Sequence, residues 1–309
     1  MAVLPLVDVR MNILVTGCTG FVGKAVCLDL LDKGYHVTGT ARKQSAEFKE
    51  AFSGKKFSFI KSNLANSDSI NRILSEKHID CVIHLAAYIP EKNYSYQNCM
   101  ATNCVGTFNL LESMKSHNVS NLIFASSQMV YAESVSSPIK EDSDLRPSTF
   151  YGLSKKHGEE LAEHYAHSQS INTIILRFSG IYGPGKKTGA VYNFIKLALA
   201  GYSLTVEQKN KVKDIIYIAD AVRLISAALT KIRSEAFAII NAGGNSISLQ
   251  RLAEKIIELT HSDSALILKE GGTQNKMQLC MQKAVPLLNH RSSSLDDSLT
   301  ELISVIKQS

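Results

Sequence analysis

The sequence predicts an α/β protein with a doubly wound parallel sheet and a second, smaller α/β domain. Three observations lead to this fold class. Residues 12–23, NILVTGCTGFVG, join a buried-strand pattern to three spaced glycines, and a helical pattern follows as far as Asp32. Strand and helix patterns then alternate along the first half of the chain. The length of 309 residues allows one large domain and a smaller one.

The glycines after the first predicted strand are spaced for phosphate binding. Gly17 would let the backbone turn sharply, Gly20 would let a pyrophosphate approach the main chain, and Gly23 would let the helix pack closely on the strand. Backbone N–H groups at the helix N-terminus, around Phe21 and Val22, would then face the phosphates. With a strand before it and a helix after it, this run predicts a dinucleotide-binding turn.

The second predicted strand, residues 36–40, ends in cations. A site selective for NAD usually carries Asp or Glu at the end of this strand, and residues 37–46 contain neither. Arg42 and Lys43 stand there instead, and a guanidinium group fits a 2′-phosphate. The sequence therefore favours NADP(H) over NAD(H), with two solvated surface cations as the alternative.

The remaining elements follow in chain order. In the larger domain we expect a strand at 57–61, a helix capped by Ser67 or Asp68 and running to 77, a strand at 80–87, a helix at about 96–117, a strand at 121–126 and a helix at 151–167. In the smaller domain we expect a helix at 191–200 and another at 249–260. The larger domain is placed in residues 1–180 and about 212–233, and the smaller one in 181–211 and 234–309. Residues 1–10 are interpreted as a disordered or edge extension.

The composition excludes several function classes. Apolar residues make up 45% and charged residues 20% of the chain, as in soluble globular proteins. The net charge of +6 comes from scattered lysines and arginines, which suits anionic small molecules better than nucleic acid. The six cysteines form no C-x-x-C pair, so we expect reduced thiols, a cytoplasmic location and no metal site. No apolar run reaches 18 residues, so no membrane span is predicted.

Tyr151 and Lys155 stand four residues apart at the start of a predicted helix. Positions i and i+4 share one helix face, so the ammonium could lie near the phenol and near a cofactor ribose at once. A cation about 6 Å away at an effective dielectric near 20 is worth on the order of 3 kcal/mol. This energy corresponds to roughly two pKa units. We therefore expect Lys155 and an oxidised nicotinamide ring together to bring the pKa of Tyr151 close to the range where it exchanges a proton with a substrate hydroxyl.

These motifs resemble the extended short-chain dehydrogenase/reductase family, also called the NAD-dependent epimerase/dehydratase family. The resemblance rests on T-G-x-x-G-x-x-G, on S-S-x-x-V-Y at residues 126–131 and on Y-x-x-x-K at residues 151–155. It implies a Rossmann domain in which Ser127, three residues before the valine, hydrogen-bonds the reacting oxygen. Ser126 is the weaker candidate. Tyr151 would be the acid and base, and Lys155 would tune it.

The resemblance also implies further cofactor contacts. Asn63 and Leu64 stand where the family often has Asp-Leu near the adenine. The run His84-Leu85-Ala86-Ala87 resembles the turn beneath the cofactor ribose, and His84 is interpreted as a core histidine. Asn103, in the pattern N-x-x-G-T, would support the backbone near the active site.

Two departures from the family pattern bear on the reaction. Gln128 and Met129 stand where sugar-nucleotide 4,6-dehydratases carry an acid–base pair, so elimination of water is not expected. Gly180 stands where the family often has an Asn that meets the nucleotide-sugar. Lys213, in a K-D-x5-D segment, would meet a diphosphate, with a surface lysine as the alternative.

The resemblance therefore implies an NAD(P)-dependent nucleotide-sugar epimerase or 4-keto reductase that transfers hydride at a sugar carbinol. Ser127, Gly180 and Lys213 would contact the substrate. The alternatives are an NADPH-dependent reductase of a non-nucleotide ketone or aldehyde, and a non-catalytic NADP-sensing regulatory protein. We expect a small-molecule substrate and neither a nucleic-acid nor a membrane partner, and the sequence allows a homodimer.

Overall fold

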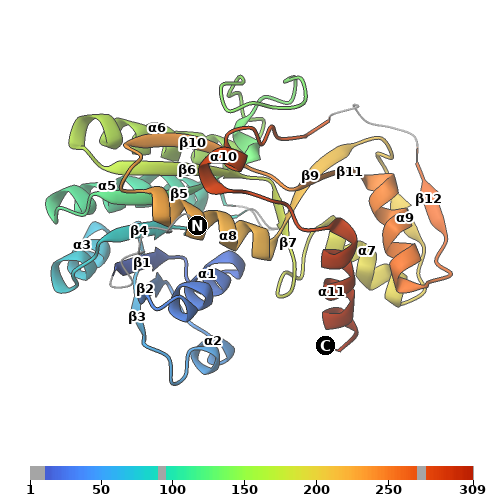
Figure 1. Cartoon of the computed structure of the whole chain (residues 1–309), viewed down its shortest axis with the longest axis horizontal. Helices are drawn as coiled ribbons and strands as arrows, with labels where there is room; N and C mark the ends of the chain where they lie inside the picture. Colours follow the sequence, from blue (N-terminus) through green and yellow to red (C-terminus); the bar gives the residue numbers. More distant parts are fainter. Residues whose placement is uncertain (1–10, 90–94, 270–275, 309) are drawn as a thin grey trace, which may run out of the picture. The chain divides into compact units, whose positions relative to one another are not determined.

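A computed structural model of the chain describes residues 11–89, 95–269 and 276–308 (Figure 1). The chain forms two compact units. Unit 1 comprises Met1–Ala132, Leu145–Arg177 and Leu224–Ile240, and unit 2 comprises Glu133–Asp144, Phe178–Arg223 and Asn241–Ser309. The extension expected at residues 1–10 lies outside the described residues.

In the described part of unit 1, one seven-stranded sheet has the order β10-β6-β5-β4-β1-β2-β3. β1 pairs in parallel with β2 on one side and with β4 on the other, so the chain winds outwards in both directions from β1. This order confirms the predicted doubly wound sheet. The strands are β1 Asn12–Thr16, β2 His36–Ala41, β3 Phe57–Lys61, β4 Cys81–His84, β5 Asn121–Ser127, β6 Asn172–Phe178 and β10 Phe237–Ala242.

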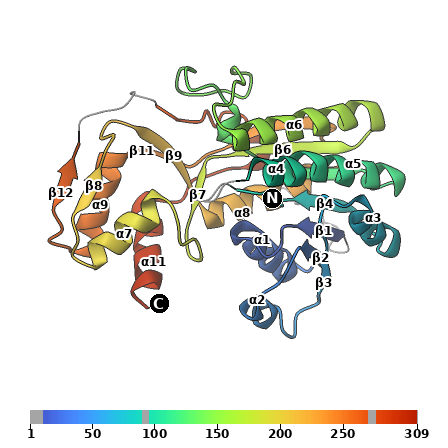
Figure 2. The same cartoon turned by 180° about the vertical axis from the view of Figure 1, so that it is seen from behind.

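Helices cover both faces of this sheet (Figures 1 and 2). α1 and α8 lie on one face, where Ser226 of α8 donates a hydrogen bond to Asp29 of α1 at 2.6 Å. α3, α5 and α6 lie on the other. The helical segments are α1 Phe21–Asp32, α2 Ala46–Ala51, α3 Ser67–Glu76, α4 Tyr96–Met100, the π-helix η1 Ala101–Val105, α5 Gly106–Ser116, the 3-10 turn η2 Gln128–Val130, α6 Phe150–Gln169 and α8 Ile218–Lys231.

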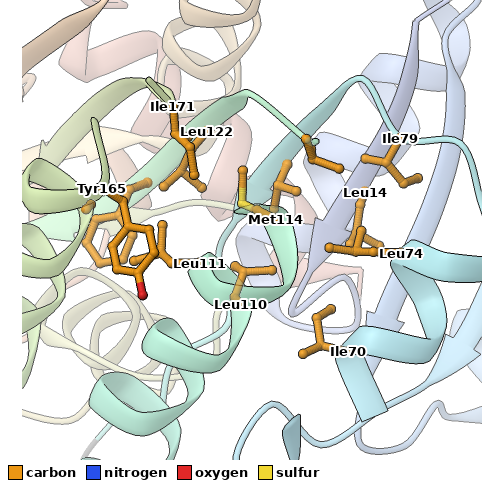
Figure 3. Packing of buried hydrophobic residues seen from close by; sticks show 14 of the residues in the cluster. Leu14, Ile70, Leu74, Ile79, Leu110, Leu111, Met114, Leu122, Tyr165 and Ile171 are labelled. Atoms are coloured by element: carbon orange, nitrogen blue, oxygen red, sulfur yellow. The ribbon is translucent and has the colours of Figure 1, made fainter. Parts of the chain in front are cut away.

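The core of unit 1 lies between the sheet and α3, α5 and α6 (Figure 3). Apolar residues recur at helical spacing on α3 and α5, so each helix turns one face to the strands. These side chains pack with strand residues into one cluster that includes Leu14, Ile70, Leu74, Leu110, Leu111, Met114, Leu122 and Tyr165. This packing fixes the strand ends that carry the site residues.

The described part of unit 2 holds two small sheets and four helices. β9 Val212–Tyr217 lies between β11 Asn245–Ser248, which is antiparallel to it, and β7 Gly180–Tyr182, which is parallel to it. β8 Leu204–Val206 pairs with β12 Leu266–Leu268. The helices are α7 Ala190–Leu199, α9 Leu249–Thr260, α10 Ala284–Leu288 and α11 Leu295–Lys307.

The two units differ from the predicted domain bounds in four segments, the shortest of which, residues 178–180, lies in unit 2. Residues 133–144 lie in unit 2, where Ile139 bonds to the main chain of residues 278–280. Residues 212–223 lie in unit 2 because β9 is the middle strand of its sheet. Residues 234–240 lie in unit 1 because β10 extends the large sheet beside β6.

Two buried carboxylates tie the C-terminal segment into unit 2. Asp214 accepts hydrogen bonds from the N–H groups of Gly244 at 2.8 Å and Leu279 at 3.0 Å. Asp220 accepts from the N–H of Ser293 at 2.8 Å and from its hydroxyl at 2.6 Å. Both acids of the K-D-x5-D segment therefore hold main chain in place. Among the described residues, no helix combines the length and apolar character of a membrane span.

Candidate active site

The turn after β1 requires glycine at two of its three positions. Gly17 has a φ of +70°, and a Cβ built on it would lie 2.7 Å from the Cα of Ala86. A Cβ on Gly23 would lie 2.2 Å from the carbonyl oxygen of Gly17. Gly20 is exposed, has a φ of −73° and is the N-cap of α1. The main chain of this turn therefore packs directly against the start of α1 on one side and against the segment after β4 on the other.

The N-terminus of α1 has the features of an anion site. Gly20 supplies no side-chain cap, and the first turn carries no acidic residue. α1 starts at Phe21, three residues before the predicted start, so Phe21 and Val22 belong to its first turn. Backbone N–H groups at such an end bind phosphates well.

The cations and the polar residues after β2 and β3 lie at the same edge of the sheet. Arg42 and Lys43 are exposed directly after β2 and form no ion pair within the described ranges. Asn63 is exposed, and its Oδ1 accepts from the N–H of Ala65 at 3.3 Å. The side chain of Leu64 lies in the core cluster, so a cofactor contact at this position would come from its main chain. The buried Oγ of Ser62 has no hydrogen-bond partner among the described residues.

A chain of hydrogen bonds fixes the turn after β4. The N–H of Ala86 donates to Thr16 Oγ1 at 3.2 Å, and Thr16 Oγ1 lies 2.7 Å from His84 Nδ1. His84 Nε2 lies 3.0 Å from Thr107 Oγ1, which donates to the carbonyl of Asn103 at 2.7 Å. Burial, with a smaller effect of Lys155, lowers the pKa of His84 to about 3. His84 is therefore a neutral core histidine, as interpreted, and it orders the turn that holds Leu85, Ala86 and Ala87.

Asn103 joins this turn to the helix of the Y-x-x-x-K motif. Its Oδ1 accepts from the N–H of Tyr88 at 2.6 Å, and its Nδ2 donates to the carbonyl of Tyr88 at 3.1 Å and to Ser154 Oγ at 2.9 Å. Asn103 lies in the π-helix η1, a geometry frequent at functional sites. The N-x-x-G-T motif identified the residue and its support of the backbone, but it gave no signal for the π-helix.

The structure brings Ser127 and Tyr151 together. Ser127 ends β5, and its Oγ accepts from the N–H of Met129 at 3.2 Å. Tyr151 lies in the first turn of α6, which Thr149 caps by accepting from the N–H of Gly152 at 3.1 Å. A side-chain hydrogen bond joins Tyr151 to Ser127. The pair lies at the carboxyl end of β5, the edge at which ligands bind to parallel sheets.

The two ionisable groups of the motif are shifted in opposite directions. Burial raises the pKa of Tyr151 to about 12, against the opposing effect of the bond to Ser127. Burial lowers the pKa of Lys155 to about 8, against the opposing charge of Glu159, and its Nζ lies 4.3 Å from the ring centroid of Phe124. The net shift of the Tyr151 pKa is upward because burial dominates it, and the expected effect of Lys155 with an oxidised nicotinamide stays a prediction.

Ser126 is held away from the role given to Ser127. Its hydroxyl donates to the buried carboxylate of Glu159, which also pairs with Arg177 at 2.7 Å. A hydroxyl bound in this way cannot turn towards a substrate without losing its hydrogen bond to that carboxylate. This contact supports the preference for Ser127. Sequence reasoning missed Glu159, although it stands four residues after Lys155.

Two of the three predicted substrate residues, Gly180 and Lys213, lie on neighbouring strands of unit 2. Gly180 begins β7 and pairs with Ile215 of β9, two residues after Lys213. A Cβ on Gly180 would meet the carbonyl oxygen of Asp214 only at 3.5 Å, so the site has room for a side chain. Partial burial and the charge of Lys211 lower the pKa of Lys213.

The chain is similar to known proteins along most of its length. The NAD dependent epimerase/dehydratase family matches residues 13–243. YtcB of Bacillus subtilis, an uncharacterized UDP-glucose epimerase, is 30% identical over 314 residues, 96% of this chain and 98% of the relative. A UDP-glucuronate 4-epimerase of Thermodesulfobacterium geofontis is 31% identical over 257 residues, 78% of each protein.

A solved structure is similar throughout. A UDP-glucuronic acid 4-epimerase from Bacillus cereus, in complex with UDP-glucuronic acid and NAD, has a TM-score of 0.85 at 29% identity and covers 96% of this chain and 99% of its own. The family match, the relatives and the seven-stranded sheet agree. The chain belongs to the NAD-dependent epimerase/dehydratase family and is an enzyme of the extended short-chain dehydrogenase/reductase type.

Proposed function

We propose that this enzyme is a nucleotide-sugar epimerase that acts at a sugar carbinol through Ser127, Tyr151 and Lys155. Unit 1 would bind the cofactor and unit 2 the nucleotide-sugar. The observation that carries the proposal is the hydrogen bond between Ser127 and Tyr151, one helical turn before the buried Lys155. The relatives named as UDP-sugar 4-epimerases support the substrate class.

The residues of unit 1 fit a dinucleotide. Gly20, the exposed N-cap of α1, carries no side chain, so main chain there would face the pyrophosphate directly. The uncapped start of α1 suits the phosphates, and the exposed side chain of Asn63 would hydrogen-bond an adenine edge. When bound, the nicotinamide would accept and return the hydride.

Each catalytic side chain has a separate task in this proposal. The phenolate form of Tyr151 takes the proton of the sugar hydroxyl, and the phenol that results gives this proton back to the sugar oxygen. With a pKa near 12, the phenolate is the minor form at neutral pH. The hydroxyl of Ser127 holds that oxygen and the phenol in line. Lys155, with a pKa near 8, carries an ammonium at neutral pH that favours the phenolate when it forms.

The proposal is tested with UDP-glucose, UDP-glucuronic acid and their simple sugars. We expect the enzyme to interconvert the C4 epimers of a UDP-sugar without net turnover of added cofactor, as followed by proton NMR. We also expect UDP to raise the melting temperature by mass action, because Lys213 would meet its diphosphate. If UDP gives no stabilisation at millimolar concentration and only a free ketone or aldehyde is reduced, the non-nucleotide reductase replaces the epimerase. If cofactor binds and no carbonyl compound reacts, the regulatory protein replaces both.

The exposed cations after β2 favour NADP(H) and make a 4-keto reductase the second candidate. We expect Arg42→Ala to weaken NADPH binding by about 1.5 to 3 kcal/mol, the usual range for a charge-assisted hydrogen bond, and to leave NADH binding nearly unchanged. Titration calorimetry with both cofactors measures this. Lys49→Ala, an exposed cation on α2, is the control for a general change in surface charge. Equal losses for NADPH and NADH would contradict a 2′-phosphate site.

We also propose a cytoplasmic homodimer. All six cysteines are free, which suits a reducing compartment. Tyr96, Val105, Phe108 and Phe150 expose large apolar side chains on α4, η1, α5 and α6 of unit 1. Apolar side chains gathered on consecutive elements suit contact with a second copy of the chain.

A further inference from the structure

Glu159 is the centre of a buried polar network in unit 1. Its carboxylate is 4% exposed and accepts from Arg177 Nε at 3.0 and 3.1 Å and from Arg177 Nη2 at 2.7 Å. Arg177, only 1% exposed, also donates to the Tyr131 hydroxyl at 3.0 Å and lies 4.9 Å from the centroid of that ring. Both charges are thus paired and out of water.

Stability alone does not account for this pair. The attraction within a buried ion pair does little more than offset the cost of removing both charges from water. Apolar residues of similar volume often give the protein the same stability or more. Glu159 makes two further interactions besides those with Arg177, and these indicate what the residue does. One is the hydroxyl of Ser126, and the other is the electrostatic effect on Lys155.

The first contact reaches Ser127. Ser126 and Ser127 are consecutive residues at the end of β5, so the bond from the Ser126 hydroxyl to Glu159 fixes the peptide that carries Ser127. Because Glu159 belongs to α6, the same bond ties the end of β5 to the helix that carries Tyr151. The separation of the two catalytic hydroxyls therefore depends on Glu159.

The second contact reaches Lys155, one turn earlier on α6. The groups that act on its ammonium are Glu159 on α6, Cys99 on α4, Cys104 on η1 and His84 on β4, and the Phe124 ring of β5 lies 4.3 Å from it. His84 is neutral, and burial raises the pKa of the Cys104 thiol to about 11. Glu159 is therefore the negative charge on which the ammonium depends at neutral pH.

We propose that Glu159 is a positioning residue that holds Ser127 in register with Tyr151 and keeps Lys155 protonated. Arg177 in turn keeps Glu159 ionised inside the protein. The inference rests on the proposed Ser-Tyr-Lys function, and it adds a residue that touches neither substrate nor cofactor.

Titration of Lys155 tests the electrostatic part without any assay of activity. In the full chain with 13C-labelled lysine, the Lys155 signal is assigned by its loss in Lys155→Met and followed by NMR against pH. We expect Glu159→Gln to lower the pKa of Lys155 by about one unit or more, a tenfold shift from ammonium to amine. Glu160→Gln is the matched control, because Glu160 is the next residue on α6, is exposed and pairs with Lys156 at 3.6 Å. An unchanged Lys155 titration in a folded Glu159→Gln protein would overturn this role.

A second variant keeps the test decisive if Glu159→Gln does not fold. The double variant Glu159→Gln/Arg177→Met removes both buried charges, and we expect a smaller fall in the pKa of Lys155 in the same direction, because the Arg177 cation that also disfavours the ammonium is removed. Ser126→Ala tests the positioning part, since it cuts the link to Ser127 and leaves the charge of Glu159. We expect kcat to fall about tenfold with the cofactor Kd and the Lys155 titration unchanged, and an unchanged kcat rejects this part. A parent enzyme without epimerase activity would contradict the proposed function, while the Lys155 titration would still decide the role of Glu159.

Discussion

Replacing Tyr151 by Phe is expected to lower turnover by about 100- to 10,000-fold, the usual contribution of general acid–base catalysis. The change removes one hydroxyl, so the ring still packs at the start of α6 and the glycine turn after β1 is unchanged. Steady-state kinetics with the best UDP-sugar gives kcat, and calorimetry gives cofactor affinity, which we expect to stay near that of the parent.

Tyr165→Phe is the matched control for this experiment. Tyr165 lies on the same helix, and its hydroxyl donates to Glu112 in the packed region shown in Figure 3. Loss of that bond should cost about 1 kcal/mol of stability and leave turnover unchanged. If Tyr151→Phe keeps its turnover within about threefold of the parent and folds normally by circular dichroism, another residue carries the proton.

Replacing Gly17 by Ala is expected to destabilise unit 1 by about 2 to 5 kcal/mol and to abolish cofactor binding. A left-handed backbone costs an Ala roughly 1 to 2 kcal/mol, and forcing a methyl group into occupied space typically costs about 1 to 3 kcal/mol more. The occupied space is the main chain of Leu85 and Ala86, which cannot move aside as a side chain could. Denaturant unfolding and cofactor titration measure the two effects.

Gly54→Ala separates the two costs. Gly54 has a φ of +71°, and a Cβ on it would meet no heavy atom of the described residues within 4 Å. We expect this variant to lose only the roughly 1 to 2 kcal/mol of the left-handed backbone and to bind cofactor normally. Equal losses of stability in Gly17→Ala and Gly54→Ala would mean that the main chain at Ala86 moves to make room for the methyl group. Close packing of the turn after β1 against Leu85 and Ala86 would then not fix that turn.

The sequence predicted the elements whose signals are local. β3 and α9 begin and end where the apolar pattern places them. α3 is capped by Asn66, one residue before the predicted cap, because three neighbouring residues can all accept the N–H bond. β4 ends at His84 and not at 87, since the N–H of Ala86 bonds to Thr16 instead of continuing the ladder.

The sequence predicted those residues of the candidate site that belong to recognisable motifs. The motifs found Ser127 and Tyr151, and the structure places them in contact. Glu159 escaped notice because a carboxylate four residues after a lysine usually marks a solvated helix face. Its partner Arg177 follows 18 residues later on a strand, a contact that only the packing of α6 on β6 creates. The raised pKa of Tyr151 likewise depends on burial, which spacing does not report.

Both units are completed by parts of the chain that the ribosome makes late. Unit 1 lacks the edge strand β10 until about residue 242, and Asp220 of unit 2 lacks its main-chain partner until Ser293 has emerged. Synthesis at about 5 to 20 residues per second separates these two points by roughly 3 to 10 s. Until β10 has emerged, β6 offers an unpaired strand edge to other chains, a template for aggregation. A chaperone that covers the β6 edge would therefore be most useful before residue 242 is made, while the contacts of Asp220 form later.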